Sequence, residues 1–295
     1  MPLWIAFTLL AVIMQPLRTA GQRQLTGVIS APAATLVRYL FGLPFAALYF
    51  LLQWQGSGEV IFTSSSQFFL LSSLAGLSQI LATFLLLKTL MLRNFAVGTA
   101  LAKTQALLAA ILGVLFFDEP LGLLASLSVL LGVAGVLIAS NWSFTLSAEG
   151  ELRALVLGLG AGLFFALTSW FAREASLTLA GPRLLSAAAV LLYCVALQTA
   201  VCLVWVVRYH RASWVMLASN QRACWFIGFT SLAGSIGWFT ANSLQNPALV
   251  NTLGQLEFFV TLLITLLYFK ERISLREAVG LMLLLASLLL LAWVS

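Results

Sequence analysis

The residues of this chain best placed for chemistry are polar side chains inside long apolar stretches. Glu257 is the clearest of them, because it lies in the middle of an apolar run at 248–268. An ionised acid near the middle of a membrane costs ~2.5–3.5 kcal/mol on insertion scales, so it should face a cavity, pair with a cation or hold a proton. Burial disfavours the ionised form of a carboxylic acid, so this group could take up and release a proton. Glu257 is therefore a candidate coupling or substrate-binding acid, and a structural hydrogen bond or ion pair is the alternative.

Lys103 is the natural counterpart of Glu257. It lies in another apolar run, at 96–116, and an offset of 152 places Lys103 over Gln255 and Gln105 over Glu257. Residues two apart on a helix point about 200° from each other, so both residues of a run cannot face one cavity squarely. The sequence leaves open whether Glu257 and Gln105 line the site or the other two residues do. A Lys103–Glu257 ion pair would neutralise both charges, and the alternative is that the long Lys103 side chain reaches the membrane surface.

A further cluster lies in the first apolar run, at 3–20. Gln15 and Arg18 flank Pro16, which removes a backbone donor and could kink a helix beside a cavity. Arg18 could bind an anionic group with two hydrogen bonds, but contact with lipid headgroups is the favoured interpretation.

Five weaker candidates could add hydrogen bonds or aromatic walls. They are Gln79, Asn242, Asn251, Trp170 and Trp238. Each of them is individually more typical of structure than of binding, and tryptophan near a helix end is often an anchor at the membrane surface.

Composition indicates the elements that must hold these residues. Hydrophobic residues make up 62% of the 295 positions and charged residues only 8%, whereas about 25% are charged in soluble domains. A membrane span needs about 20 apolar residues as helix. Ten such spans are predicted, at 3–20, 33–53, 67–89, 96–116, 121–139, 154–172, 184–207, 224–243, 248–268 and 274–293. The fold class is therefore an all-α integral membrane protein, with no soluble domain.

An internal repeat organises these spans. Residues 94–121 superimpose on 246–273, with Asn94 on Asn246 and Glu119 on Glu271. Five spans per half is an odd number, so the halves 1–147 and 148–295 would enter the membrane from opposite sides. This inverted 5+5 repeat is common in secondary transporters, which bind substrate near the middle of the membrane between the halves.

Several classes of function are disfavoured. The chain has no phosphate-binding glycine loop, no GxSxG and no HExxH motif, and the three cysteines and one histidine show no metal-ligand spacing. We therefore expect no enzyme activity, no cofactor and no metal. The net charge of +6 is attributed to the basic loops that orient membrane proteins rather than to nucleic-acid binding.

Two stretches carry a resemblance to a known family. "FFDEPLGLLASLSVLLGVAGVLI" at 116–138 and "YFKERISLREAVGLMLLLASLLLLA" at 268–292 each place a Glu-containing turn before an apolar helix, and "LVRYLFG" contains Arg38. The chain resembles the EamA-type branch of the drug/metabolite transporter superfamily over nearly its whole length. The resemblance implies ten helices, transport of a small metabolite and a role for Arg38, but not a particular substrate. Members of that branch often carry a proline in the fourth and ninth helices, where this chain has "KTQALL" (103–108) and "QLEFFV" (255–260), so a polar site is expected to replace a kink.

The leading hypothesis is a secondary transporter, more an exporter than an importer, that moves a small polar or amphipathic metabolite such as an amino acid by alternating access. Protons are the expected coupling ion. Transport of a lipid or lipid-linked substrate is one alternative, favoured if the cavity opens sideways. A non-transporting scaffold is another, favoured if Glu257 and Lys103 form a closed ion pair without a cavity.

The expected location is the inner membrane of a bacterium, with the lipid bilayer as solvent. A monomer is expected, with a dimer as the alternative. The distribution of basic residues places both termini outside the cytoplasm.

Overall fold

The protein is a bundle of helices in the computed structural model, which describes residues 2–57, 65–92, 101–118, 121–139, 149–267 and 275–294. Every element of secondary structure in these ranges is a helix. The elements are α1 (Leu3–Leu25), α2 (Ala31–Leu40), α3 (Leu43–Ser57), α4 (Ser66–Leu92), α6 (Gln105–Phe116), α7 (Leu123–Ala139), α8 (Glu149–Leu177), α9 (Arg183–Tyr209), α10 (Arg211–Ser219), α11 (Gln221–Leu244), α12 (Pro247–Leu253), the 3-10 turn η1 (Gly254–Leu256), α13 (Glu257–Leu267) and α14 (Leu275–Val294).

Seven of the ten predicted spans correspond to single helices, and three differ. The span predicted at 33–53 is divided into α2 and α3, and the span at 248–268 is divided into α12, η1 and α13, with residue 268 outside the described ranges. In the span at 96–116, residues 96–100 also lie outside them, and a turn at 103–104 precedes α6. The connection between the seventh and eighth predicted spans contains a short helix, α10, that the sequence pattern did not predict.

Local sequence explains where two of the divided helices begin. The Ser30 side chain accepts a hydrogen bond from the Ala33 amide, and the Asn246 side chain accepts one from the Ala248 amide at 2.8 Å. Each cap is followed within two residues by a proline, which lacks the amide hydrogen that a first turn leaves unused. At the α2–α3 break, a Cβ on Gly42 would lie 2.6 Å from the Arg38 carbonyl oxygen, so a side chain does not fit there.

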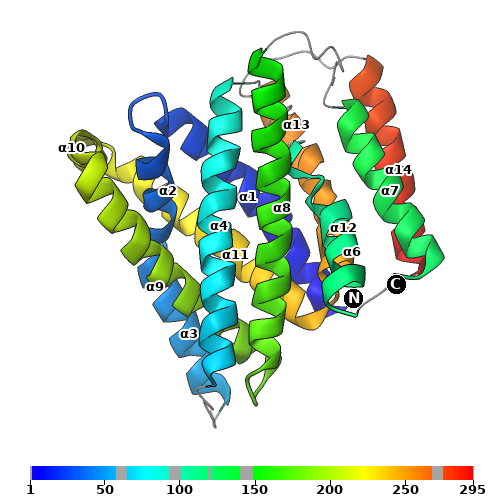
Figure 1. The fold of residues 1–295 in the computed structure, drawn as a ribbon, viewed down its shortest axis with the longest axis horizontal. Coiled ribbons are helices and arrows are strands. Elements are labelled where there is room, and N and C mark those ends of the chain that lie inside the picture. Colours follow the sequence, from blue (N-terminus) through cyan, green and yellow to red (C-terminus); the bar gives the residue numbers. More distant parts are fainter. Residues whose placement is uncertain are drawn as a thin grey trace.

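Three pairs of helices have the most extensive contacts (Figure 1): α1 with α11, α4 with α8, and α7 with α14. Glycines permit the close contact of α11 with α1. Other glycines permit the contact of α8 with the segment at 101–104, just before α6. A Cβ on Gly237 of α11 would lie 2.5 Å from the Phe7 carbonyl oxygen of α1. A Cβ on Gly162 of α8 would lie 2.7 Å from the Thr104 hydroxyl, and one on Gly158 would lie 2.5 Å from Leu101. These two glycines therefore permit close packing of α8 against the segment at 101–104.

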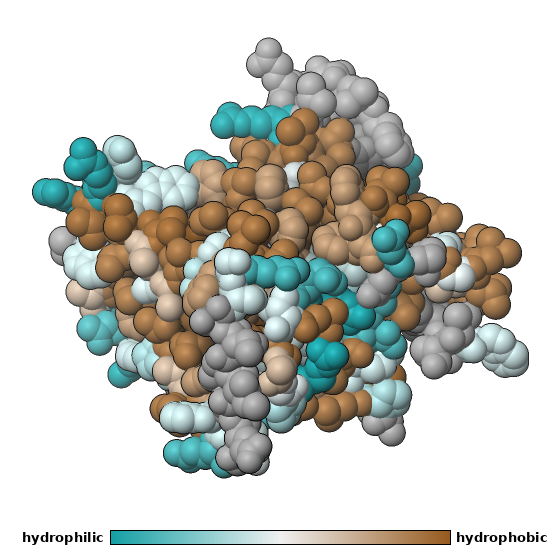
Figure 2. Space-filling model, turned by 60° about the horizontal axis from the view of Figure 1, so that its bottom comes forward, coloured by the Kyte–Doolittle hydropathy of each residue, from teal (hydrophilic) through white to brown (hydrophobic). Residues whose placement is uncertain are grey.

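The outer surface is apolar. Figure 2 shows broad hydrophobic areas over one face of the molecule, and large side chains such as Leu70, Val204 and Leu123 are exposed. Five described helical segments are long and apolar enough to cross a membrane: Leu3–Leu25, Ala31–Ser57, Ser66–Leu92, Arg153–Leu177 and Arg183–Tyr209. Such a surface is suited to lipid rather than water, consistent with a multi-pass membrane protein.

Candidate functional site

The site forms where two helices are interrupted at corresponding positions. Lys103 and Thr104 form a turn before α6, and η1 separates α12 from α13. Under the offset of 152, this turn falls on residues 255–256, inside η1, and the first residues of α6 and α13, Gln105 and Glu257, correspond. The expectation that polar residues would replace a kink here is wrong. Both helices are broken without a proline, and the breaks are where the polar residues gather.

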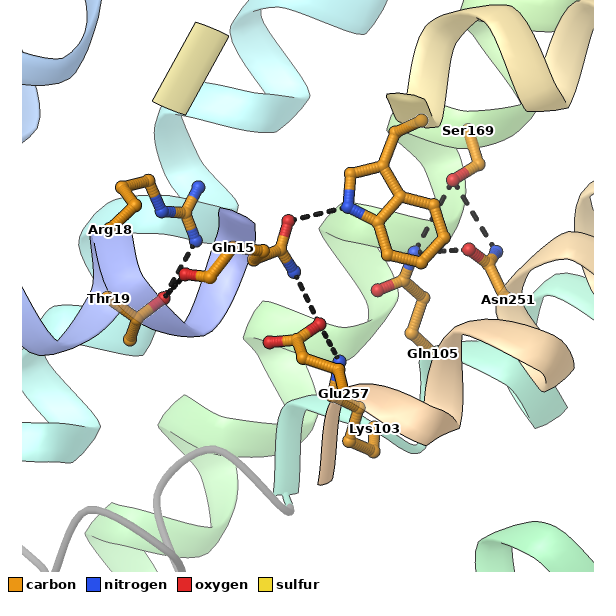
Figure 3. Close-up of polar contacts among 9 residues, drawn as sticks. Gln15, Arg18, Thr19, Lys103, Gln105, Ser169, Asn251 and Glu257 are labelled. Carbon is orange, nitrogen blue, oxygen red and sulfur yellow. Dashed lines mark hydrogen bonds and ion pairs between the residues drawn. The ribbon is translucent and has the colours of Figure 1, made fainter. Parts of the chain in front are cut away.

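Lys103 and Glu257 meet across these breaks as an ion pair (Figure 3). Glu257 is 2% exposed and Lys103 is 9% exposed, so both charges are buried. Glu257 begins α13 directly after η1, and its backbone amide donates to carbonyls of η1. The expected ion pair is confirmed, and the alternative in which Lys103 reaches the membrane surface is wrong.

Gln15 of α1 connects this pair to α11. Its amide nitrogen donates to Glu257 Oε2 at 3.0 Å, and its amide oxygen accepts from Trp238 Nε1 at 2.6 Å. Gln15 therefore uses both ends of its amide, which fixes the orientation of the side chain. Two segments distant in sequence, α1 and the turn before α6, thus hold one carboxylate, and α11 acts on it only through Gln15.

A second polar group connects α6, α8 and α12. Gln105 Nε2 donates to Asn251 Oδ1 at 2.9 Å, and both residues approach the Ser169 hydroxyl at 3.4 Å (Figure 3). Ser169 of α8 was not predicted, because a single serine in an apolar helix is too common to indicate a site. Gln105 and Asn251, both candidate site residues from the sequence, are hydrogen-bonded to each other here.

A small cavity separates these groups. Its volume is about 20 Å³, room for one water molecule. Polar side chains from both halves line it: Gln15, Gln79, Gln105, Thr168, Ser169 and Asn242. Trp238 and Phe239 supply aromatic walls. The ion pair itself does not line this cavity, and Gln15 stands between the two.

Two of the lining residues, Gln79 and Asn242, have contacts that sequence patterns did not reveal. Gln79 Oε1 accepts a hydrogen bond from Gln198 Nε2 of α9 at 2.8 Å. The backbone carbonyl oxygen of Asn242 accepts one from Arg173 Nη1 at 3.1 Å. The oxygen of the Asn242 side-chain amide is buried without a hydrogen bond to the described residues. An unused acceptor beside a cavity is available to a bound molecule.

Gln255 lies away from the cavity. A Cβ on Gly132 of α7 would lie 2.1 Å from its side-chain oxygen, so Gln255 packs against α7, and its amide makes no hydrogen bond. Neither proposed division of the four residues is therefore right. Gln105 lines the cavity, Lys103 and Glu257 pair beside it, and Gln255 alone lies at the flank.

Trp170 is a packing residue in this structure. It is fully buried, its indole donates to the Ala109 carbonyl at 2.8 Å, and its ring stacks on Phe117 at 4.5 Å. It belongs neither to the cavity wall nor to the membrane surface, and both interpretations offered for it are wrong.

Arg18 lies within electrostatic range of Glu257, and a second buried arginine, Arg38, lies within electrostatic range of Arg18. Arg18 is 2% exposed, so the interpretation that it reaches lipid headgroups is wrong. Its Nη2 donates to the Thr19 hydroxyl at 3.0 Å, and its Nε makes no hydrogen bond. Arg38 of α2 is 3% exposed and donates to the hydroxyls of Thr83, Ser231 and Ser235 at 2.6, 3.0 and 3.5 Å.

The fold is shared with known structures. Twenty-seven chains of solved structures match this chain. One of them, described only as the crystal structure of a protein, has a TM-score of 0.73 and 14% sequence identity, and the match covers 98% of this chain and 97% of that chain. At this identity the likeness concerns the fold alone. No family model matches the sequence. No curated protein matches it.

Proposed function

We propose that this protein is a secondary transporter, similar to the EamA branch, that exports a small polar or amphipathic metabolite by alternating access. The observation that carries this proposal is the buried Lys103–Glu257 pair, which joins broken helices of the two halves beside a polar cavity. Broken helices that meet near the middle of a membrane are the substrate and ion sites of many transporters. The proposed location is the inner membrane of a bacterium, and the proposed assembly is a monomer.

The helix contacts support a 5+5 inverted repeat, with halves 1–147 and 148–295. Exchanging the halves would turn the α1–α11 pair into the α8–α4 pair, and both are among the most extensive contacts. The α7–α14 pair would be exchanged with itself. Its centre is reciprocal, because the Ser128 hydroxyl donates to the Ser287 carbonyl at 2.9 Å and the Ser287 hydroxyl donates to the Ser128 carbonyl at 2.7 Å.

The ion pair supplies a mechanism for coupling. While Glu257 is ionised, it holds Lys103 and Gln15 and thereby ties α13 to the turn before α6 and to α1. A proton on Glu257 would remove this attraction, and the halves could then rock to open the cavity to one side. The cavity of the described conformation has room for about one water, which is too little for a metabolite, so we assign this conformation to an occluded state.

A lipid substrate is the second candidate, because a largely apolar groove lies between α1 and α11. Its volume is about 630 Å³, and it combines apolar side chains such as Leu17 and Phe226 with Arg222 at one end. The polar cavity between the halves favours a soluble metabolite. A scaffold without transport would need neither of these spaces.

The test compares metabolites released into the medium by cells that express the wild type or Glu257→Gln at equal levels. Asp118→Asn is the control, because Asp118 is exposed and its left-handed backbone (φ 48°) is tolerated by asparagine as well. A compound exported by the wild type and the control, but not by Glu257→Gln, would support the proposal. Equal release by all three would show that Glu257 has only a structural role.

A further inference from the structure

The buried charges near the site do not balance. Among the residues that the structure describes, the buried charged side chains are Arg18, Arg38, Lys103 and Glu257. Lys103 and Glu257 neutralise each other, so two arginines remain in excess. A buried charge without a counter-charge is strongly unfavourable, because its lost hydration is not repaid by attraction. The other two acids whose side chains are described are not among the buried charges, since Asp118 is exposed and Glu174 is half-buried near the end of α8.

Arg18 has hydrogen-bonding capacity left unused. Its guanidinium carries five N–H donors, of which only Nη2 is engaged by a side chain, that of the neighbouring Thr19 (Figure 3). Its Nε is buried with no acceptor. Arg18 shares a face of α1 with Gln15, one turn away, and lies within electrostatic range of both Arg38 and Glu257.

Tyr39 adds another unused donor at the same place. Its side chain is 1% exposed, the Arg38 guanidinium lies 4.8 Å from the centre of its ring, and its hydroxyl is buried without a hydrogen-bond partner among the described residues. Thr83 accepts from Arg38 at 2.6 Å, so the phenol, Thr83 and Arg38 are neighbours. Tyr39 also lies within electrostatic range of Arg18. Two buried donors without acceptors therefore lie beside two buried cations without counter-charges.

An anion would satisfy these three side chains, Arg18, Arg38 and Tyr39. A carboxylate or phosphate oxygen accepts hydrogen bonds from arginine Nε and from a phenol, and its charge would offset the excess positive charge. Arg38, whose donors are already used by three hydroxyls, would act mainly through its field. Building on the transport proposal, we propose that the substrate is an organic anion whose carboxylate or phosphate binds Arg18 and the Tyr39 hydroxyl, next to Arg38.

The test measures thermal unfolding of the purified full chain in a neutral detergent, followed by tryptophan fluorescence. A bacterial metabolite extract is divided by anion exchange into a bound fraction and a flow-through fraction, and phosphate and succinate serve as single-compound probes. We expect the bound fraction to raise the unfolding temperature of the wild type. Arg18→Gln should weaken this effect roughly 10- to 100-fold in ligand concentration, and Tyr39→Phe about 3- to 10-fold, as expected for loss of a charged and a neutral donor. Arg208→Gln, an exposed arginine near the end of α9, should leave the effect unchanged.

Tyr39→Phe guards against a folding artefact, because it removes only an unpaired hydroxyl and should leave the unfolding temperature without ligand unchanged or higher. Stabilisation by the flow-through fraction alone would overturn the anion proposal while leaving transport of a neutral or zwitterionic metabolite in place. Stabilisation by neither fraction would also overturn it. Stabilisation in nanodiscs of phosphatidylglycerol relative to phosphatidylcholine, with no effect of the soluble anions, would assign the arginines to a lipid headgroup and overturn the metabolite proposal.

Discussion

Removing the negative charge of the central ion pair should lower the free energy of unfolding more than removing the positive charge does. In Glu257→Gln, the Lys103 ammonium stays buried and has lost its counter-charge, with Arg18 still within electrostatic range of the site. Breaking a buried ion pair in this way costs ~3–5 kcal/mol. Lys103→Met leaves Glu257 with the Gln15 hydrogen bond at 3.0 Å and with the field of Arg18. Because the carboxylate keeps this support, Lys103→Met should lower the free energy of unfolding by only ~2 kcal/mol.

The double variant Lys103→Met/Glu257→Gln measures the interaction energy between the two side chains. It leaves neither charge unpaired, so it should be more stable than Glu257→Gln alone, with a coupling energy of ~2 kcal/mol between the two positions. At about 2 °C per kcal/mol for a chain of this size, the unfolding temperature should fall by ~6–10 °C for Glu257→Gln and by ~4 °C for Lys103→Met.

The assay is thermal unfolding in detergent without added anions, with Asp118→Asn as the control that changes an exposed acid to an amide. Equal losses for the two single variants would contradict the idea that Gln15 and Arg18 support Glu257. Additive losses in the double variant would show that the two side chains do not interact energetically, and would remove the ion pair from the proposed coupling mechanism.

Three further predictions concern packing, hydrogen bonding and coupling. Gly237→Ala should lower the free energy of unfolding by ~1–3 kcal/mol, because the new methyl group meets the Phe7 carbonyl, whereas Gly56→Ala, which meets nothing within 4 Å, should not destabilise; thermal unfolding distinguishes them. Trp238→Phe keeps an aromatic wall but loses the 2.6 Å hydrogen bond of the indole to Gln15. Export should therefore fall in the release assay, while the unfolding temperature drops by only ~2 °C. Unchanged export would argue against a role of this hydrogen bond in coupling. Glu257→Gln removes a negative charge within electrostatic range of Arg18, so half-maximal stabilisation by succinate at one fixed pH should need a lower concentration than in the wild type; an equal or higher concentration would contradict the linkage.

The site illustrates how far residue type and spacing can predict contacts. Glu257 and Lys103 could be paired from sequence because a charge in an apolar helix has few ways to be stabilised, and a partner at equal depth in the other half is one of them. The same reasoning failed for Arg18, because an arginine near a helix end and an arginine turned inward have the same local sequence. It also failed for Trp170, whose partners Ala109 and Phe117 belong to another helix.

What the sequence determined by itself was the class of fold and the position of most helices, because both follow from local quantities: the share of apolar residues, the length of each run and the residues that begin a helix. The repeat offset also identified the two segments at which the polar residues gather. Only the tertiary structure decided that both segments are broken there, that Gln15 links the carboxylate to Trp238, and that Arg18 and Tyr39 are buried with donors unused. These features depend on which helix faces lie opposite one another, and that is a property of the packed bundle rather than of any single stretch of sequence.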